Sequence, residues 1–372
     1  MSGDPSAKWL QEASEQRVIS WLREALRRLA SDPPSKALPG TPLSVPVAVD
    51  ALQTSCEIER SLEEALESWR ALGPPEPLGR LLLVLPSNVE TSGIRPLVLA
   101  LIARNAVWVR PSSRRKGVLP RLIAHLEAVD PLLARAVRCV EFPREDPKWD
   151  ELRPAVDAVH LFGSDEAAQA LRGRGFRVIA HGSALSLAWV PRRASSFEAM
   201  ELAYDVARYD QRGCLSPQAL IFEEGLEIKG FVESLHEALS VLDVRFPRGA
   251  MSLEERAEEQ RFRLTSVAIG SHLYEGKGHA LSIEAGHRLR SSPGLRNLLV
   301  YQMPRGLFLS LVQHLGPRLK RVGTPRDAVQ GLQKELNEGV EVVAFGEMQR
   351  PGLLSRMEPS LWGGWVRSLA GR

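Results

Sequence analysis

Residues 81–112 have the sequence LLLVLPSNVETSGIRPLVLALIARNAVWVRPS. Two short apolar runs, residues 81–85 and 106–109, flank a longer apolar segment, residues 94–104, whose length suits a helix. Short runs that are apolar on both faces are typical of strands in a parallel sheet that helices cover. We therefore predict an α/β fold built on a parallel sheet of nucleotide-binding type. The alternation continues in a predicted helix at 118–129 and in predicted strands at 136–142 and 155–162.

Small or polar residues follow three of these predicted strands. They are Pro86-Ser87-Asn88, Arg110-Pro111-Ser112 and Gly163-Ser164-Asp165. Ligands of open parallel sheets bind in the crevice beyond the carboxyl ends of the strands. We expect these three loops to converge on one site.

The patterns divide the chain into three parts and a tail. Residues 1–72 are predicted to be an N-terminal helical segment, with a helix at 56–72 that follows a proline-rich connector at 32–46. Residues 73–190 form the predicted dinucleotide-binding domain. Residues 191–344 form a predicted second α/β domain, which carries the catalytic group, and residues 345–372 are a candidate return to the first domain.

The composition is that of a chain with balanced charge. Of the 372 residues, 48 are Lys or Arg and 45 are Asp or Glu, so the formal net charge is +3. This balance argues against nucleic acid as the main partner. The three cysteines lack the paired spacing of metal sites, so we predict neither a metal centre nor a disulfide framework. No apolar run suits a signal peptide or a membrane span, so we expect a cytoplasmic location.

Cys214 has the local sequence of an accessible thiol. It follows a glycine in a turn between a predicted helix and a predicted strand, and Arg212 and Ser216 flank it. A neighbouring cation favours the thiolate, which is the reactive form of cysteine. Alone, this pattern also fits a small buried apolar residue, which is the interpretation that we favour for Cys56 and Cys139.

The segment Asp210-Gln211-Arg212-Gly213-Cys214-Leu215-Ser216-Pro217-Gln218 resembles the active-site segment of the LuxC-type long-chain acyl-CoA reductases, a branch of the aldehyde dehydrogenase superfamily. Pro86-Ser87-Asn88, Val109-Arg110-Pro111-Ser112 and Phe162-Gly163-Ser164 are similar to three loops of that superfamily and occur in the same order. Together with residues 314–323, the resemblance covers about residues 75–325. It implies an aldehyde-dehydrogenase-like fold, with a parallel nucleotide-binding sheet domain and a second α/β catalytic domain.

The resemblance also implies a mechanism. Cys214 attacks an acyl thioester, forms an acyl enzyme and, after hydride transfer, releases an aldehyde. The Asn88 side-chain amide and the Cys214 backbone N–H are the implied donors to the oxyanion.

One departure from the superfamily bears on the reaction. Its hydrolytic members carry a glutamate in a Glu-Leu-Gly-Gly motif, where this chain has Ala180-His181-Gly182-Ser183. Without a water-activating base, we expect thioester reduction rather than oxidation of an aldehyde to the free acid. His181 is a candidate proton donor to the departing thiolate, and a structural histidine is the alternative.

The segment 110–116 favours NADPH as the cofactor because it contains four cations, two serines and no acid. A 2′-phosphate needs cations and hydroxyl donors, whereas a carboxylate usually binds the 2′-hydroxyl of NAD. We predict that Arg110, Ser112 and Arg114 contact the cofactor, as do Gly163 and Ser164. The alternatives are a solvated loop for Arg114 and a helix cap for Ser164.

The resemblance implies a long-chain acyl substrate that is bound to CoA or to a protein, and an acyl-protein synthetase as a partner. The aldehyde would serve luminescence, lipid metabolism or secondary metabolism. By the same analogy we expect a homo-oligomer. Two alternatives stay open, a reductase of a short acyl-CoA or acyl phosphate and a catalytically silent scaffold that binds acylated partners.

Overall fold

The computed structural model describes residues 7–72, 76–113, 116–143, 145–182, 184–336, 339–355 and 365–366. Its first sheet has five strands in the order β3-β2-β1-β4-β5, and all neighbouring strands are parallel. The prediction of a parallel sheet is confirmed. The strands are β1 (Arg80–Val84), β2 (Ala106–Arg110), β3 (Val137–Cys139), β4 (Ala158–Phe162) and β5 (Val178–His181).

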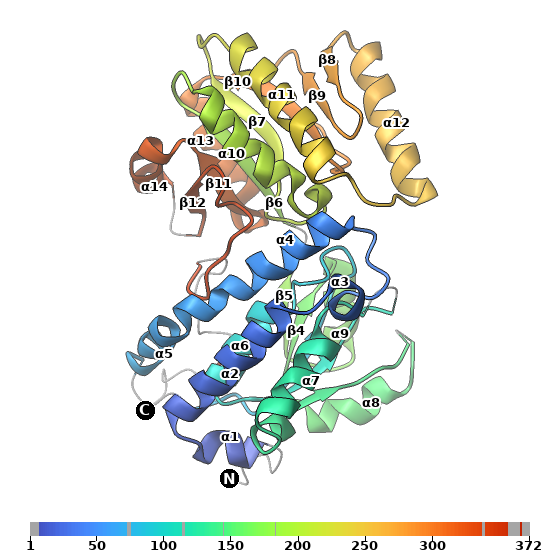
Figure 1. Cartoon of the computed structure of the whole chain (residues 1–372), viewed down its shortest axis with the longest axis vertical. Helices are drawn as coiled ribbons and strands as arrows, with labels where there is room; N and C mark the ends of the chain where they lie inside the picture. The colour runs from blue at the N-terminus through green and yellow to red at the C-terminus, as the bar shows by residue number, and fades with distance from the viewer. Residues whose placement is uncertain are drawn as a thin grey trace.

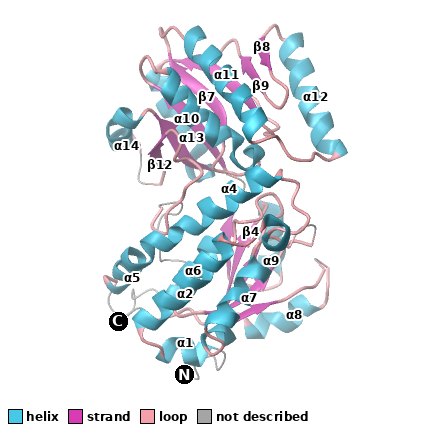
Figure 2. Ribbon diagram, in the orientation of Figure 1, coloured by secondary structure: helices cyan, strands magenta, loops and turns pink. Residues whose placement is uncertain are grey.

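Apolar side chains on both faces explain why these runs form central strands. Leu81, Leu82 and Leu83 of β1 are all fully buried, and burial of each side chain stabilises the fold by about 1.5–3 kcal/mol. The helices between the strands cover the sheet (Figures 1 and 2). They are α6 (Ile94–Ile102), α7 (Leu119–Val129), α8 (Lys148–Leu152) and α9 (Asp165–Gly173).

The N-terminal part adds helices α1 (Lys8–Glu12), α2 (Glu15–Ala30), α3 (Pro34–Ala37), α4 (Val45–Cys56) and α5 (Leu62–Arg70). Helix α2 packs beside α7, where the Trp21 indole donates to the Leu126 carbonyl at 2.8 Å. The predicted connector at 32–46 is wrong in part, because α3 lies inside it and α4 begins at its end. Pro46 is tolerated in the first turn of α4, where a backbone N–H has no partner within the helix. The predicted helix at 56–72 is also corrected, since a 3₁₀ turn at Glu57–Ser61 precedes α5.

The second sheet has seven strands in the order β12-β11-β6-β7-β10-β9-β8, and only the β8–β9 pair is antiparallel among these strands. Its strands are β6 (Leu185–Val190), β7 (Pro217–Glu223), β8 (His272–Glu275), β9 (Ala280–Ile283), β10 (Asn297–Met303), β11 (Leu319–Thr324) and β12 (Glu341–Ala344). Its helices are α10 (Ser196–Ala207), α11 (Lys229–Arg245), α12 (Leu253–Ala268), α13 (Arg305–Leu315) and α14 (Val329–Glu335).

Strand β6 corrects one predicted boundary. A domain division at residue 190 would cut the seven-stranded sheet, because β6 pairs with β7 on one side and with β11 on the other. The chain therefore passes from the first sheet to the second between β5 and β6. The chain returns to the first sheet at Trp365 and Val366, where Val366 bridges Pro77 and the Asn105 side chain donates to the Trp365 carbonyl.

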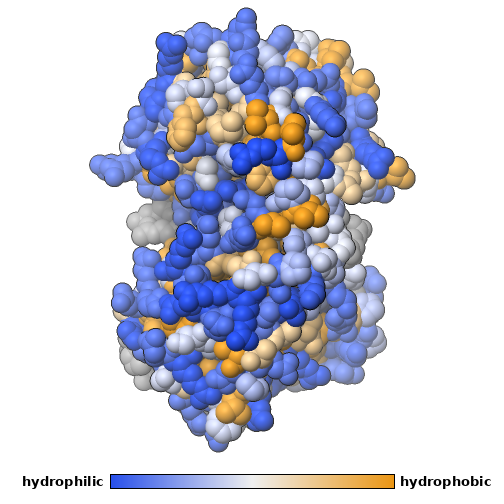
Figure 3. Space-filling view, in the orientation of Figure 1, coloured by the Kyte–Doolittle hydropathy of each residue, from blue (hydrophilic) through white to orange (hydrophobic). Residues whose placement is uncertain are grey.

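The two sheets lie one above the other, with α4 at the level between them (Figure 1). The side of the molecule in Figure 3 is mostly hydrophilic, with apolar side chains in scattered groups. No helix in the described part of the chain combines the length and the apolar character needed to cross a bilayer.

Candidate active site

A cavity of about 530 Å³ lies where the carboxyl ends of the first sheet's strands meet the amino ends of β6, β7 and β11 in the second sheet. The first sheet contributes Asn88 after β1, Gly163 after β4 and His181 at the end of β5. The second sheet contributes Cys214, which precedes β7, and Lys320 of β11. Two of the three loops that we expected to converge do line this cavity, whereas Arg110 and Ser112 are not among its described lining residues.

An unusual backbone turn presents Cys214 to the cavity. Helix α10 ends at Ala207, and Tyr209, Asp210 and Gln211 then follow with φ of 52°, 51° and 56°. A left-handed conformation costs about 1–2 kcal/mol for each residue with a side chain, so a run of three must be held by its surroundings. The Gln211 side-chain amide donates to the Pro217 carbonyl at 2.7 Å, and the Ser186 hydroxyl donates to the Cys214 carbonyl at 2.8 Å.

The Cys214 side chain is exposed, but it opens into the cavity rather than onto the convex surface of the protein. Desolvation by the surrounding protein raises the pKa of its thiol, while the positive charge of Lys320, the hydrogen bond from its own backbone N–H and the charge of Arg321 oppose that rise. Both observations fit a side chain on the wall of a cavity, where the sulfur is accessible although protein atoms surround it.

The predicted effect of Arg212 on this thiol is wrong. Its guanidinium forms an ion pair with Glu255 of α12 and donates to the Ala250 carbonyl at 3.0 Å. It is therefore directed toward α12, and the cation that lowers the pKa of Cys214 most is Lys320. The other two cysteines differ from each other. Cys56 is buried, as predicted, and burial raises its pKa to about 12, whereas Cys139 is half-buried rather than in the core.

Asn88 lies beside residues 209–218, which are called the cysteine segment. Its amide Nδ2 donates to the Arg212 carbonyl at 3.0 Å, which links the loop after β1 to the chain two residues before Cys214. Gly213 permits this approach, since a Cβ there would lie 3.3 Å from the Val89 Cγ2. An amide nitrogen carries two N–H groups, so one remains for a second acceptor.

His181 is part of a stack of rings on the wall of the cavity. The Phe162 ring lies parallel to it, with centroids 4.1 Å apart, and its Nε2 lies 3.1 Å from the Nδ1 of His160. His160 is fully buried, as predicted, and stacks on Trp365 at 3.8 Å. One of the two facing nitrogens must donate and the other accept, so this bond fixes the tautomer of His181 relative to His160.

The predicted cofactor residues have varied surroundings. Arg110 is buried, donates twice to the Phe142 carbonyl at 3.2 and 3.0 Å, and lies 5.3 Å from the centre of the Trp149 ring. Ser112 is half-buried at the end of β2, and Arg114 lies outside the described residues. Lys116, from the same segment, pairs with Glu141 at 2.9 Å.

Ser164 acts as the cap of α9, since its hydroxyl accepts from the Ala167 N–H at 3.4 Å. Asp165 and Glu166 occupy the first turn of this helix and complement its positive end. Phosphate groups are therefore less favoured at this helix terminus, and Gly163, which lines the cavity, is the better placed of the two predicted residues.

Sequence reasoning missed several residues of the site. Lys320 and Gln349 both line the cavity, and the Gln349 amide donates to the Ser216 hydroxyl at 2.5 Å. Lys320 lies inside the segment 314–323 that resembled a family motif, so that resemblance was the available signal. Much of the remaining wall is apolar, with Ile58, Val89, Ile94, Leu99, Phe162 and Leu215.

Comparison with known proteins identifies the family. The model of the acyl-CoA reductase (LuxC) family matches residues 52–350, which is more than half of the chain. The chain belongs to the LuxC family. Similar curated proteins include the long-chain acyl-protein thioester reductase of Aliivibrio fischeri, with 22% identity over 253 residues, 64% of this chain and 52% of that one. The enzyme of the same name from Vibrio harveyi is 26% identical over 189 residues, 49% of this chain and 39% of that one. The matches to these LuxC relatives span about half of their length or less.

Solved structures establish the fold of this LuxC-family chain. Glyceraldehyde-3-phosphate dehydrogenase GapN from Methanocaldococcus jannaschii, complexed with NADP, superposes with a TM-score of 0.70 at 13% identity, covering 91% of this chain and 82% of that one. The aldehyde dehydrogenase KauB from Pseudomonas aeruginosa gives a TM-score of 0.71 at 15% identity, covering 90% and 77%. The predicted aldehyde-dehydrogenase-like fold is confirmed.

Proposed function

We propose that this protein reduces an acyl thioester to an aldehyde with NADPH, through an acyl enzyme on Cys214. The observation that carries the proposal is the cavity that Cys214, Asn88 and His181 share. Membership of the LuxC family and the names of the thioester reductases to which the chain is similar support the same reaction.

The first step is acyl transfer to Cys214. Its thiolate attacks the carbonyl carbon of the thioester, and the carbonyl electrons move to oxygen. The Cys214 backbone N–H and the second N–H of Asn88 are the donors that we assign to this oxyanion. When the oxyanion collapses, the original carbon–sulfur bond breaks, and His181 is the candidate donor of a proton to the departing thiolate.

Reduction follows on the same carbon. A nicotinamide, when bound, would supply a hydride to this carbon, and the same two donors would stabilise the oxyanion that results. Its collapse restores the carbonyl, breaks the bond to Cys214 and releases the aldehyde. His181 and Gly182 stand where hydrolytic relatives of the superfamily carry their base, so the acyl enzyme lacks that route to hydrolysis.

The apolar part of the cavity wall supports a long acyl chain as substrate. Ile58 lies in the 3₁₀ turn after α4, and Ile94 and Leu99 lie on α6 beside the first sheet. Transfer of a fatty chain from water to such a surface contributes about 0.8 kcal/mol for each methylene group. The acyl donor, CoA or a protein, the acyl-protein synthetase partner and a homo-oligomeric state are further proposals that rest on the family.

The described residues fit a nicotinamide dinucleotide. The carboxyl ends of β1, β4 and β5 open onto the cavity, and Gly163 and Gly182 leave backbone accessible there. The proposal of NADPH is supported by the positive charge of residues 110–116 and by NADP in the structures of two similar folds. Arg110 and Lys116 would have to leave Phe142 and Glu141 to contact a 2′-phosphate.

Nucleotide oxidation with acyl-CoAs of increasing chain length tests the proposal. We expect aldehyde formation with NADPH that is highest for long chains and absent from the Cys214→Ala variant. No turnover with any acyl-CoA or acyl-protein thioester, together with turnover of acyl phosphates, would contradict it. Failure to bind either nucleotide would remove the enzymatic interpretation altogether.

A further inference from the structure

Two left-handed backbone segments contact each other, and one of them lies just before Cys214 in the chain. The first is the run Tyr209–Gln211, and the second is formed by Gly294, Leu295 and Arg296, with φ of 70°, 57° and 64°. The two backbones are in close contact, since a Cβ on Gly294 would lie 2.8 Å from the Gln211 carbonyl oxygen. The Asn297 side chain closes the second segment by donating to the Gly294 and Leu295 carbonyls at 2.9 and 3.1 Å.

A buried ion pair joins the two segments. The Arg296 guanidinium donates to one oxygen of Asp210 from Nε at 3.0 Å and from Nη2 at 2.7 Å, and both side chains are fully buried. The other Asp210 oxygen accepts from the Gly249 backbone N–H at 3.0 Å. Both carboxylate oxygens are thus used, one by the loop between α11 and α12 and the other by the residue before β10.

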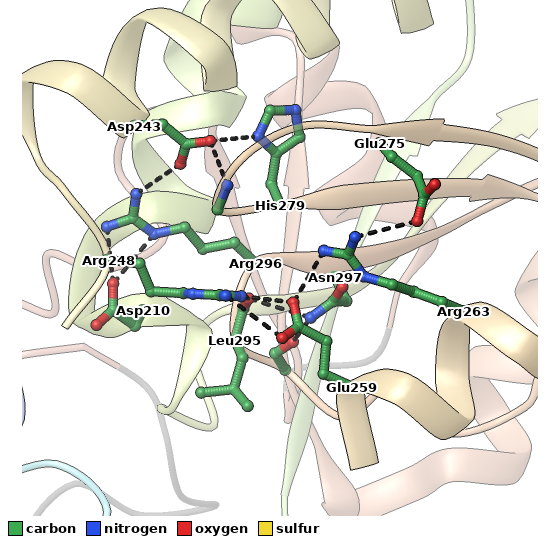
Figure 4. Close-up of polar contacts among 12 residues, drawn as sticks. Asp210, Asp243, Arg248, Glu259, Arg263, Glu275, His279, Leu295, Arg296 and Asn297 are labelled. Atoms are coloured by element: carbon green, nitrogen blue, oxygen red, sulfur yellow. Dashed lines mark hydrogen bonds and ion pairs between the residues drawn. The ribbon is translucent and has the colours of Figure 1, made fainter. Parts of the chain in front are cut away.

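A second set of contacts holds the Arg296 side chain in place. Arg296 also donates to Asp243 at 3.2 Å, and Asp243 bonds the His279 Nδ1 at 2.8 Å. Figure 4 shows Arg296 between the carboxylates of Asp210 and Asp243, with His279 beyond the latter. The His279 Nε2 in turn lies 3.0 Å from the Nδ1 of His236 on α11. The chain of contacts therefore runs from α11 to the strained segment, and it holds Arg296 in one position.

On the other side, Tyr209 attaches the segment to the N-terminal helices. Its hydroxyl lies 2.8 Å from the Ser55 hydroxyl and donates to the Ala51 carbonyl of α4 at 3.3 Å. The left-handed run is thus held from both sides, by the contacts of Tyr209 with α4 and by the Asp210–Arg296 ion pair. Only three residues lie between Asp210 and Cys214, so a shift of the left-handed run displaces the Cys214 thiol.

We propose that the Asp210–Arg296 ion pair is the positioning device for Cys214. It compensates for the left-handed conformation of residues 209–211 and thereby fixes where the thiol and its backbone N–H stand in the cavity. Neither residue lines the cavity, so neither is catalytic in itself. The inference rests on the proposed function only in taking Cys214 as the reacting group.

The test compares Asp210→Asn, which keeps the shape but removes the charge, with Arg296→Lys, which keeps the charge but loses the two-bond contact. The matched control is Glu284→Gln, because Glu284, which follows β9, is likewise a buried acid paired with an arginine, Arg290. Two readouts are measured in the full chain. They are the single-turnover rate of acyl transfer from a long-chain acyl-CoA to Cys214, and amide hydrogen exchange of the peptide that contains residues 209–216.

We expect Asp210→Asn to slow acyl transfer by about a hundredfold, as a displacement of roughly 1 Å does, and to speed exchange in that peptide. Arg296→Lys should slow acyl transfer by a smaller factor than Asp210→Asn does. Glu284→Gln should behave like the wild type in both readouts. Acyl transfer that is unchanged in Asp210→Asn, or lowered equally by Glu284→Gln, would overturn the proposal. If Asp210→Asn does not fold, the same comparison is decided by Arg296→Lys.

Failure of the proposed function would give a different result. In that case the wild type would acquire no acyl group from any thioester. Hydrogen exchange would then be the measurement that tests the positioning role. Faster exchange of residues 209–216 in both variants but not in the control would support the positioning role, and unchanged exchange would reject it.

Discussion

Two segments of this protein were singled out from the sequence for their residue types, and the structure treats them differently. The cysteine segment, residues 209–218, is held by contacts of Tyr209 with α4, of the Cys214 carbonyl with β6 and of Asp210 with the buried Arg296. The segment 110–116 carries long cationic side chains, and its described cations Arg110 and Lys116 contact Phe142 and Glu141. The position of a short nucleophilic side chain is set by the backbone that carries it. A long cationic side chain can instead contact any acceptor within its reach, so its partner is harder to predict from the sequence.

The largest expected effect is at Cys214. Its replacement by alanine should lower the rate of aldehyde formation by at least about a thousandfold, because the covalent route is lost. Steady-state aldehyde production is the measurement. Cys139→Ala is the control, since this half-buried residue lies in the first sheet, and an equal loss there would show that Cys214 is not the nucleophile.

A second large effect is expected at Asn88. Asn88→Asp removes both amide N–H groups at nearly constant shape, and loss of an oxyanion donor typically lowers kcat by about a hundred- to a thousandfold. Separate measurement of kcat and KM checks this prediction. The value of kcat should fall while KM stays nearly unchanged, because the substrate ground state should bind almost as before. A change confined to KM would argue that Asn88 only joins the loop after β1 to Arg212.

The pH dependence of Cys214 gives a smaller effect with a definite sign. Because desolvation raises the pKa of the thiol, its alkylation by iodoacetamide should increase as pH rises through a value above that of an ordinary cysteine. Lys320→Met removes the cation that opposes this rise, so the profile should shift to still higher pH. Lys334→Met, an exposed change on α14, is the control, and a shift to lower pH in Lys320→Met would contradict the account.

The smallest effects are expected in the segment 110–116. Lys116→Ala should hardly change stability, since exposed ion pairs contribute little. Arg110→Met should lower the melting temperature, because the half-buried Phe142 carbonyl loses its donors, at a cost of about 1 kcal/mol. If Arg110→Met instead keeps its stability and raises only the KM for NADPH, Arg110 contacts the cofactor rather than the core.

The parallel sheet could be predicted from the sequence because runs such as Leu81–Leu83 are apolar at every position and must be buried on both faces. The loops that carry Asn88 and Gly163 followed from the carboxyl ends of those strands. The helix α4 escaped prediction because prolines near its start suggested a connector. The role of Arg212 was predicted wrongly because its partner, Glu255, lies far away in the sequence. The roles of Lys320 and Arg296 were not predicted for the same reason, because only the packing of distant parts of the chain brings them close to the cysteine segment.

The central claim is tested most directly by mass spectrometry of the protein after reaction with a long-chain acyl-CoA in the absence of nucleotide. The account predicts one acyl group on the peptide that contains Cys214, and its loss as free aldehyde when NADPH is added. An acyl group on another residue, or one that NADPH does not release as aldehyde, would contradict it.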